Sequence, residues 1–157
     1  MHKAFTATAS QAAAIHLVRP MHWDEAEHEI PPALKSLARA TGFKANAGET
    51  VFHADEEGKL ANVLFGLGDA PDALAVAALS GKLPAGDYEI ARDAGLPFAH
   101  IAAGWADGAY RFDRYLTEKT DPPRLVLGED EDAAALDREA DAIKLLRDMI
   151  NTPAQHM

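Results

Sequence analysis

The chain has 157 residues, no cysteine and a formal charge of −10 at pH 7, from 15 Lys and Arg against 25 Asp and Glu. This length suits one globular domain with its own core, and the lack of cysteine excludes disulfides, thiolate metal sites and cysteine nucleophiles. The acidic balance argues against nucleic-acid and membrane partners, because phosphate backbones and anionic lipids are bound by clustered cations, and we expect a cytoplasmic protein.

Apolar runs and turn residues predict the elements of the first half of the chain. Residues 12–18, AAAIHLV, predict a buried strand that ends at Arg19 and Pro20. The following segment, MHWDEAEHEIPP, is interpreted as a polar loop, and its two prolines open a helix that ends near Gly42. TVFHA and LANVLFGLG flank the turn DEEGK and predict a β-hairpin.

Helices and strands also alternate in the second half. The predicted elements are a helix in 72–83, a strand in 86–91, a helix over 97–115, a strand at 123–127 and a long helix over 129–151. The acidic start of the last helix complements the helix dipole. We expect the apolar stripe of this helix to face the domain, and the stripe consists of Leu136, Ala140, Ile143, Leu146 and Ile150. The fold class expected is α/β: one domain with a mixed β-sheet flanked by helices.

One turn has the sequence context of a phosphate-binding loop. FGLGDAP, residues 65–71, follows a predicted strand and precedes a predicted helix. A complete G-x-G-x-x-G fingerprint needs a third glycine where this chain has Pro71. Gly66, Gly68 and Asp69 are therefore open to two interpretations, an anion-binding turn at a helix N-terminus or a tight strand-to-helix turn.

The predicted helix over 97–115 contains the segment GWADGAYRFDRY. Gly104 and Gly108 lie four residues apart and leave one helix edge bare, so that another element can approach closely. Trp105 and Phe112 lie on the apolar stripe, and Tyr110 flanks it. The segment is open to two interpretations, an interface or ligand-facing helix, or a core helix packed closely against the sheet.

No constellation of residues predicts catalysis. The seven histidines form no His-Glu-x-x-His pair, and Glu25-x-x-His28 occurs once, in a predicted loop. No serine stands in a nucleophile elbow, and the acidic residues before the last helix are typical of a solvated helix start. We assign no catalytic residue, no metal ligand and no cofactor to this chain, which is not expected to be an enzyme by itself.

Four motifs occur in the order VLFGLGD, LPAGDYEIA, GWADGAYRFDRY and LLRDMINTPAQHM. Together they resemble the leucine aminopeptidase (cytosol aminopeptidase) family, closest to its bacterial branch, over roughly residues 45–157. The resemblance implies a two-domain metallopeptidase that uses two divalent metals, zinc or manganese, and assembles as a hexamer. The metal ligands and catalytic residues would belong to a C-terminal domain with an Asn-Thr-Asp-Ala-Glu-Gly-Arg motif, which this chain lacks. The implied N-terminal fold is macrodomain-like.

This resemblance divides the chain into two expected parts. Residues 1–130 would form the N-terminal α/β domain, and 131–157 a linker helix and an exit toward an absent catalytic domain, with Asn151, Thr152 and Pro153 as the interdomain linker. The expected role is structural, within a leucyl aminopeptidase that releases N-terminal amino acids from peptides. The alternative is a stand-alone macrodomain-like module that binds a small anionic or nucleotide-type ligand at the turn with Gly66 and Gly68.

Overall fold

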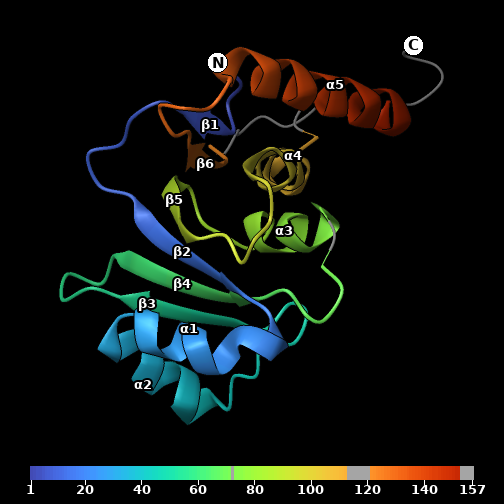
Figure 1. Ribbon diagram of the computed structural model, residues 1–157. Coiled ribbons are helices and arrows are strands. Elements are labelled where there is room, and N and C mark those ends of the chain that lie inside the picture. The colour runs from blue at the N-terminus through green and yellow to red at the C-terminus, as the bar shows by residue number, and fades with distance from the viewer. Residues whose placement is uncertain (72, 113–120, 153–157) are drawn as a thin grey trace.

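A six-stranded sheet forms the centre of the fold in the computed structural model, which describes residues 1–71, 73–112 and 121–152 (Figure 1). The strands are β1 (Phe5–Thr6), β2 (Ala13–Val18), β3 (Thr50–Ala54), β4 (Leu60–Gly66), β5 (Gly86–Arg92) and β6 (Pro123–Val126). Their spatial order is β1-β6-β5-β2-β4-β3. Only β3 pairs antiparallel, with β4, and the other described pairs are parallel. The sheet is therefore mixed, as the alternation of elements predicted.

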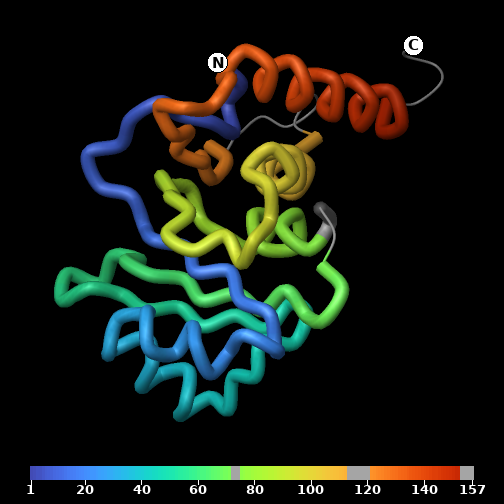
Figure 2. Tube along the Cα trace, in the orientation of Figure 1, coloured from blue at the N-terminus to red at the C-terminus, as the bar shows by residue number. Residues whose placement is uncertain are grey.

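Helices cover both faces of this sheet. They are the short 3-10 helix η1 (Pro20–His22), α1 (Trp23–Glu29), α2 (Pro32–Thr41), α3 (Ala73–Ser80), α4 (Phe98–Ala109) and α5 (Ala133–Asn151). α1 and α2 lie on one face and α3 and α4 on the other, while α5 packs against α4 (Figures 1 and 2). The N-terminus lies beside the start of α5, where the backbone N–H of His2 donates to Asp137 Oδ1 at 2.8 Å.

The alternation of side chains along the central strands produces two hydrophobic cores. Ile15 and Leu17 of β2 point into the larger core, which α3, α4 and the first half of α5 complete. Val18 points into the smaller core beneath α1 and α2, together with Leu34 and Leu64. A strand buried on both faces reads as a continuous apolar run rather than an alternating one, which is why the run at 12–18 predicted β2 correctly.

Turn residues correctly predicted where two further elements end. The hairpin of β3 and β4 turns at Gly58, whose φ of +80° is a left-handed conformation that glycine adopts without steric cost. α2 begins at Pro32 and ends at Thr41, and Gly42, with φ +70°, caps it. Both elements are confirmed.

Two predicted boundaries were wrong. The segment interpreted as a polar loop contains α1, in which only Ala26 is buried, so that its sequence carries almost no apolar period. The helix predicted over 97–115 ends at Ala109, because Tyr110 is extended with φ −61° and ψ 134°. Phe112 therefore lies beyond the helix rather than on its face, and residues 113–115 lie outside the described part of the chain.

The predicted stripe of α5 was also partly wrong. The helix begins after Asp132, whose Oδ1 accepts from the backbone N–H of Ala135 at 3.0 Å, and Leu136 and Ala140 are buried as expected. Leu146 and Ile150, however, are 59% and 71% exposed. In the second half of the helix, polar residues take the inward positions. Among the described residues, no helix is both long and apolar enough to cross a membrane.

Candidate functional site

The glycine turn after β4 is held by backbone hydrogen bonds. The N–H groups of Gly66, Leu67 and Gly68 donate to the carbonyls of Glu49, Val18 and Ala45 at 2.8, 2.8 and 3.0 Å. These three donors are thus engaged by the protein and are not available to an anion, while Asp69 is exposed.

Both glycines of the turn are needed for space or backbone conformation. A Cβ on Gly66 would lie 2.2 Å from the carbonyl oxygen of Asn46. Gly68 has φ +73°, and a Cβ there would lie 2.9 Å from that of Ala47. These contacts favour the interpretation as a tight strand-to-helix turn, with residues 45–47 packed directly against it.

Helix α4 is a core helix, and α3 is the element that approaches its bare edge. A Cβ on Gly108 would lie 2.1 Å from the carbonyl oxygen of Ala77 and 2.2 Å from Ser80 Oγ. Ser80 is fully buried and donates its hydroxyl to the carbonyl of Trp105 at 3.0 Å. Gly104 is also buried within α4. Gly108 is thus explained by packing of α4 against α3 rather than against the sheet.

Trp105 lies in the interior rather than toward a ligand. Its side chain is fully buried, and its indole N–H donates to the carbonyl of Pro123 at 3.1 Å, which ties α4 to the start of β6. The ring of Tyr88 lies beside it, with centroids 5.5 Å apart. Burial raises the pKa of Tyr88 to about 12, and its hydroxyl donates to the carbonyl of Pro84 at 3.0 Å.

Five polar residues join the end of α4 to the second half of α5, and we call them the α4–α5 clasp: Asp107, Tyr110, Arg147, Asp148 and Asn151. Arg147 donates to Asp107 Oδ1 at 2.7 Å, and its guanidinium lies 4.9 Å from the centroid of the Tyr110 ring. The Tyr110 hydroxyl donates to Asp148 Oδ1 at 2.7 Å and accepts from Asn151 at 3.4 Å. Partial burial, reinforced by the Asp148 carboxylate, raises the pKa of Tyr110, so the hydroxyl keeps the proton that it donates.

The opposite side of α5 carries a contiguous apolar surface, which we call the α5 apolar face. It consists of Leu145, Leu146, Met149 and Ile150, which are 62%, 59%, 57% and 71% exposed. Leu145 and Met149 are four residues apart, as are Leu146 and Ile150, and residues four apart are neighbours on a helix surface. Exposed apolar side chains that gather on one side of a folded domain make that side a candidate contact surface. The sequence prediction had turned two of these residues inward and did not include Leu145 or Met149.

Beyond the clasp the chain leaves the helix. Asn151 is the last helical residue, and Thr152 is extended with φ −81° and ψ 122°. The Thr152 hydroxyl donates to the carbonyl of Asp148 at 2.6 Å, which fixes the direction of exit. Pro153, the third residue of the predicted linker, lies outside the described residues.

The described residues contain no candidate metal centre. In 1–71, 73–112 and 121–152, no group of three or more His, Asp or Glu side chains is placed to hold a metal ion.

Comparison with known proteins identifies the class. Residues 14–128 match the family model of the M17 aminopeptidase N-terminal domain, and the chain belongs to this family. No protein in a search of curated sequences matches.

Solved structures match the fold at low sequence identity. The cytosol aminopeptidase of Coxiella burnetii matches with a TM-score of 0.74 and 23% identity, over 96% of this chain and 33% of its own. A mutant of tomato leucine aminopeptidase matches with a TM-score of 0.61 and 18% identity, over 98% of this chain and 39% of its own. The bottromycin maturation enzyme BotP in complex with Mn matches with a TM-score of 0.59 and 24% identity, over 94% of this chain and 33% of its own. The chain thus spans between one third and two fifths of the length of these three structures.

Proposed function

We propose that this chain is the non-catalytic N-terminal domain of a dinuclear-metal leucyl aminopeptidase that releases N-terminal amino acids from peptides. The observation that carries the proposal is the α5 apolar face, whose four side chains are exposed in the part of the chain that the structure describes. Membership of the M17 N-terminal domain family supports it, as does the greater length of the structural relatives, of which the matched part is 33–39%.

The occupant proposed for the α5 apolar face is the catalytic domain of the same enzyme. The face lies on the helix that leads to Thr152, so a domain connected there would be held close to it. The α4–α5 clasp holds the other side of α5, and the helix would act as a rigid connector. In this proposal residues 1–130 are the domain proper, 131–157 are the linker helix and exit, and Asn151, Thr152 and Pro153 are the interdomain linker.

The chemistry of peptide hydrolysis is assigned to the partner domain. Two divalent metals, manganese or zinc, would be bound there, and the Mn complex of BotP is the relative that supports a metal-dependent reaction. We assign no step of the reaction to the described residues of this chain. Homo-oligomeric assembly as a hexamer is proposed from the family resemblance, and a cytoplasmic location from the name of the Coxiella burnetii relative.

A peptidase assay tests whether catalysis belongs to another domain. The 157-residue chain is incubated with leucine p-nitroanilide and Mn²⁺ or Zn²⁺, beside a full-length M17 aminopeptidase as positive control. We expect no turnover above the buffer rate with this chain. Turnover that a chelator removes would overturn the assignment of catalysis to another domain.

A further inference from the structure

Helix α5 is held to the domain in two different ways along its length. Among the described residues, the larger core contains Leu136 and Ala140, with Ala133 packed against it, and neither core contains a residue of α5 after Ala140. The second half of the helix, residues 144–151, is joined to α4 by the α4–α5 clasp, while its apolar face is exposed. The first half is thus anchored by buried apolar side chains and the second half by polar ones.

The clasp is accessible to water and to dissolved ions. The side chains of Asp107 and Arg147, which form its ion pair, are 25% and 41% exposed. Ion pairs in contact with solvent contribute much less to stability than buried apolar side chains do, and salt screens them. We therefore expect the second half of α5 to be held less strongly than the first half, and in a manner that depends on ionic strength.

Residues 144–151 have little else to keep them helical once the clasp is broken. Most of the stability of a helix in a protein comes from tertiary packing, and short helical segments without it are marginal in water. Proteins open locally where buried apolar contacts are few. Without the clasp, α5 can therefore unwind from Asn151 back toward the anchor at Ala140, while the first half stays docked on the core.

We propose that the α4–α5 clasp is a releasable latch. When it is closed, residues 144–151 are helical and lie against α4, and when it is open, this segment unwinds independently of the rest of the domain. In the proposed parent enzyme the latch would change the connection to the catalytic domain from a stiff helix to a flexible link. That consequence rests on the proposed function, whereas the latch is a property of this chain and can be tested without the catalytic domain.

Hydrogen exchange measured by NMR on the 157-residue chain tests the latch. The measured quantity is the protection factor of each backbone amide, compared between residues 137–143 and 145–151 of α5. We expect lower protection in 145–151, and a further loss of about twofold or more between about 50 mM and about 500 mM NaCl, because salt screens the ion pair. The protection of 137–143 should change little. A salt effect of equal size in both halves would overturn the proposal.

Two variants separate release of the clasp from ordinary fraying of a helix end. Arg147→Gln and Asp107→Asn each remove one charge of the ion pair, and each should lower the protection of 145–151 by about threefold or more. Gln and Arg have similar helix propensities, and Asp107 lies on α4, so that simple fraying of α5 would respond to neither change. Unchanged protection in both variants, or a loss spread equally over both halves of α5, would contradict the latch.

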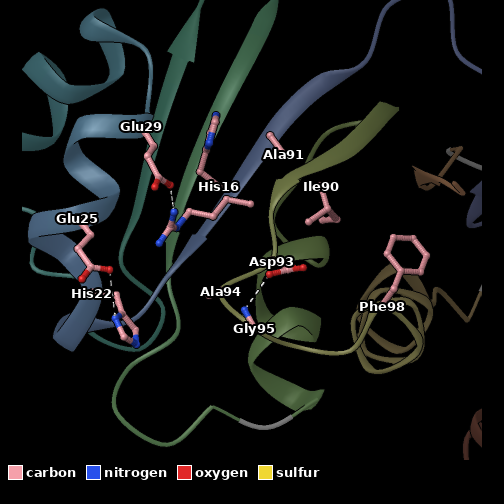
Figure 3. A pocket seen from close by; sticks show the side chains of 11 residues that line it. His16, His22, Glu25, Glu29, Ile90, Ala91, Asp93, Ala94, Gly95 and Phe98 are labelled. Atoms are coloured by element: carbon pink, nitrogen blue, oxygen red, sulfur yellow. Dashed lines mark hydrogen bonds and ion pairs between the residues drawn. The ribbon is translucent and has the colours of Figure 1, made fainter.

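The ion pair between Glu29 and Arg92 supplies the matched control. It joins the end of α1 to the end of β5 in a cleft of about 750 Å³ at the carboxyl ends of β2 and β5, which His16 also lines (Figure 3). α1 lies on the opposite face of the sheet from α4 and α5 (Figure 1). Glu29→Gln removes one negative charge, as Asp107→Asn does, and should leave the protection of 145–151 unchanged. An equal loss in this variant would show that the segment responds to overall charge rather than to the clasp, and would overturn the proposal.

Discussion

The hydroxyl of Tyr110 donates a hydrogen bond of 2.7 Å to Asp148 Oδ1, and this contact, together with the burial of Leu136 and Ala140, orients α5 about its axis. Residues advance by 100° along an α-helix, so that Arg147, Asp148 and Asn151 share one side. Leu145 and Ile150 then lie on the other side, toward solvent. The polar clasp and the apolar face are two consequences of one helix orientation.

The contact between Tyr110 and Asp148 should contribute measurably to stability. Tyr110→Phe removes a hydrogen bond to a charged acceptor but keeps the ring beneath Arg147, and we expect the free energy of unfolding to fall by about 1 kcal/mol. A double-mutant cycle with Asp148→Ala in urea measures the coupling between the two side chains. Strictly additive effects of the two substitutions would show that the hydrogen bond is not formed in solution.

Gly108 should not tolerate even alanine. Alanine favours a helix over glycine by ~1 kcal/mol, but its Cβ here would lie 2.1 Å from the carbonyl oxygen of Ala77. We expect Gly108→Ala to destabilise the chain by about 1–3 kcal/mol, the usual cost of overpacking. Gly128→Ala is the control, since a Cβ there would meet only Glu131 Cγ at 3.7 Å. If thermal unfolding shows equal effects, the close approach of α3 and α4 is wrong.

The outward orientation of the α5 apolar face can be tested in this chain alone. Leu146→Glu and Ile150→Glu replace side chains that are 59% and 71% exposed, so we expect each to change the free energy of unfolding by no more than about 0.5 kcal/mol. Leu136→Ala, at a position that is 6% exposed on the same helix, should cost about 2–5 kcal/mol. Large losses from the two glutamate variants would instead place this face inside the domain.

His16 should make the domain less stable in mild acid. Burial lowers its pKa below the ordinary 6.5, so the unfolded chain binds a proton more readily than the folded chain. The free energy of unfolding is therefore unaffected by His16 above pH 6.5 and falls as the pH drops toward its folded-state pKa. The group also faces Arg92, whose charge lowers the pKa further, and Asn62, whose amide lies 3.4 Å from Nε2.

Urea unfolding at pH 7.5 and pH 5.5 measures this dependence. His16→Gln removes the titrating group, so the variant should lose less stability between the two pH values than the parent chain. The pKa of His2 is also lowered by burial, but His2 is present in both proteins and cancels in the difference. Equal losses in the two proteins would show that His16 titrates normally in the fold.

The central elements could be predicted because a single local signal determines each of them. β2 is buried on both faces and is a continuous apolar run, and Gly42 and Gly58 take left-handed conformations at the ends of their elements. α1 was missed because Ala26 is its one buried residue. α4 was predicted too long because Phe112 continues the apolar spacing after the backbone has become extended at Tyr110.

The sites depend on relationships that a linear pattern does not contain. Leu145, Leu146, Met149 and Ile150 are apolar whichever way α5 faces, and the orientation depends on tertiary contacts such as the one between Tyr110 and Asp148. The glycines of α4 and of the turn after β4 predicted that another segment packs closely against them. The sequence pattern did not say which segment this is. The cleft combines β2, α1 and the end of β5, which are brought together only by the order of strands in the sheet.

Binding in trans between this chain and the separately expressed catalytic domain of the proposed parent aminopeptidase tests the proposed function most directly. We expect saturable binding, weakened by about tenfold or more when Leu146→Glu and Ile150→Glu are combined, because buried apolar anchors dominate interface energies. Arg138→Glu adds a glutamate at another exposed position of α5 and should bind like the parent chain. Absence of binding, or equal binding by all three proteins, would contradict the assignment of the α5 apolar face as the docking surface.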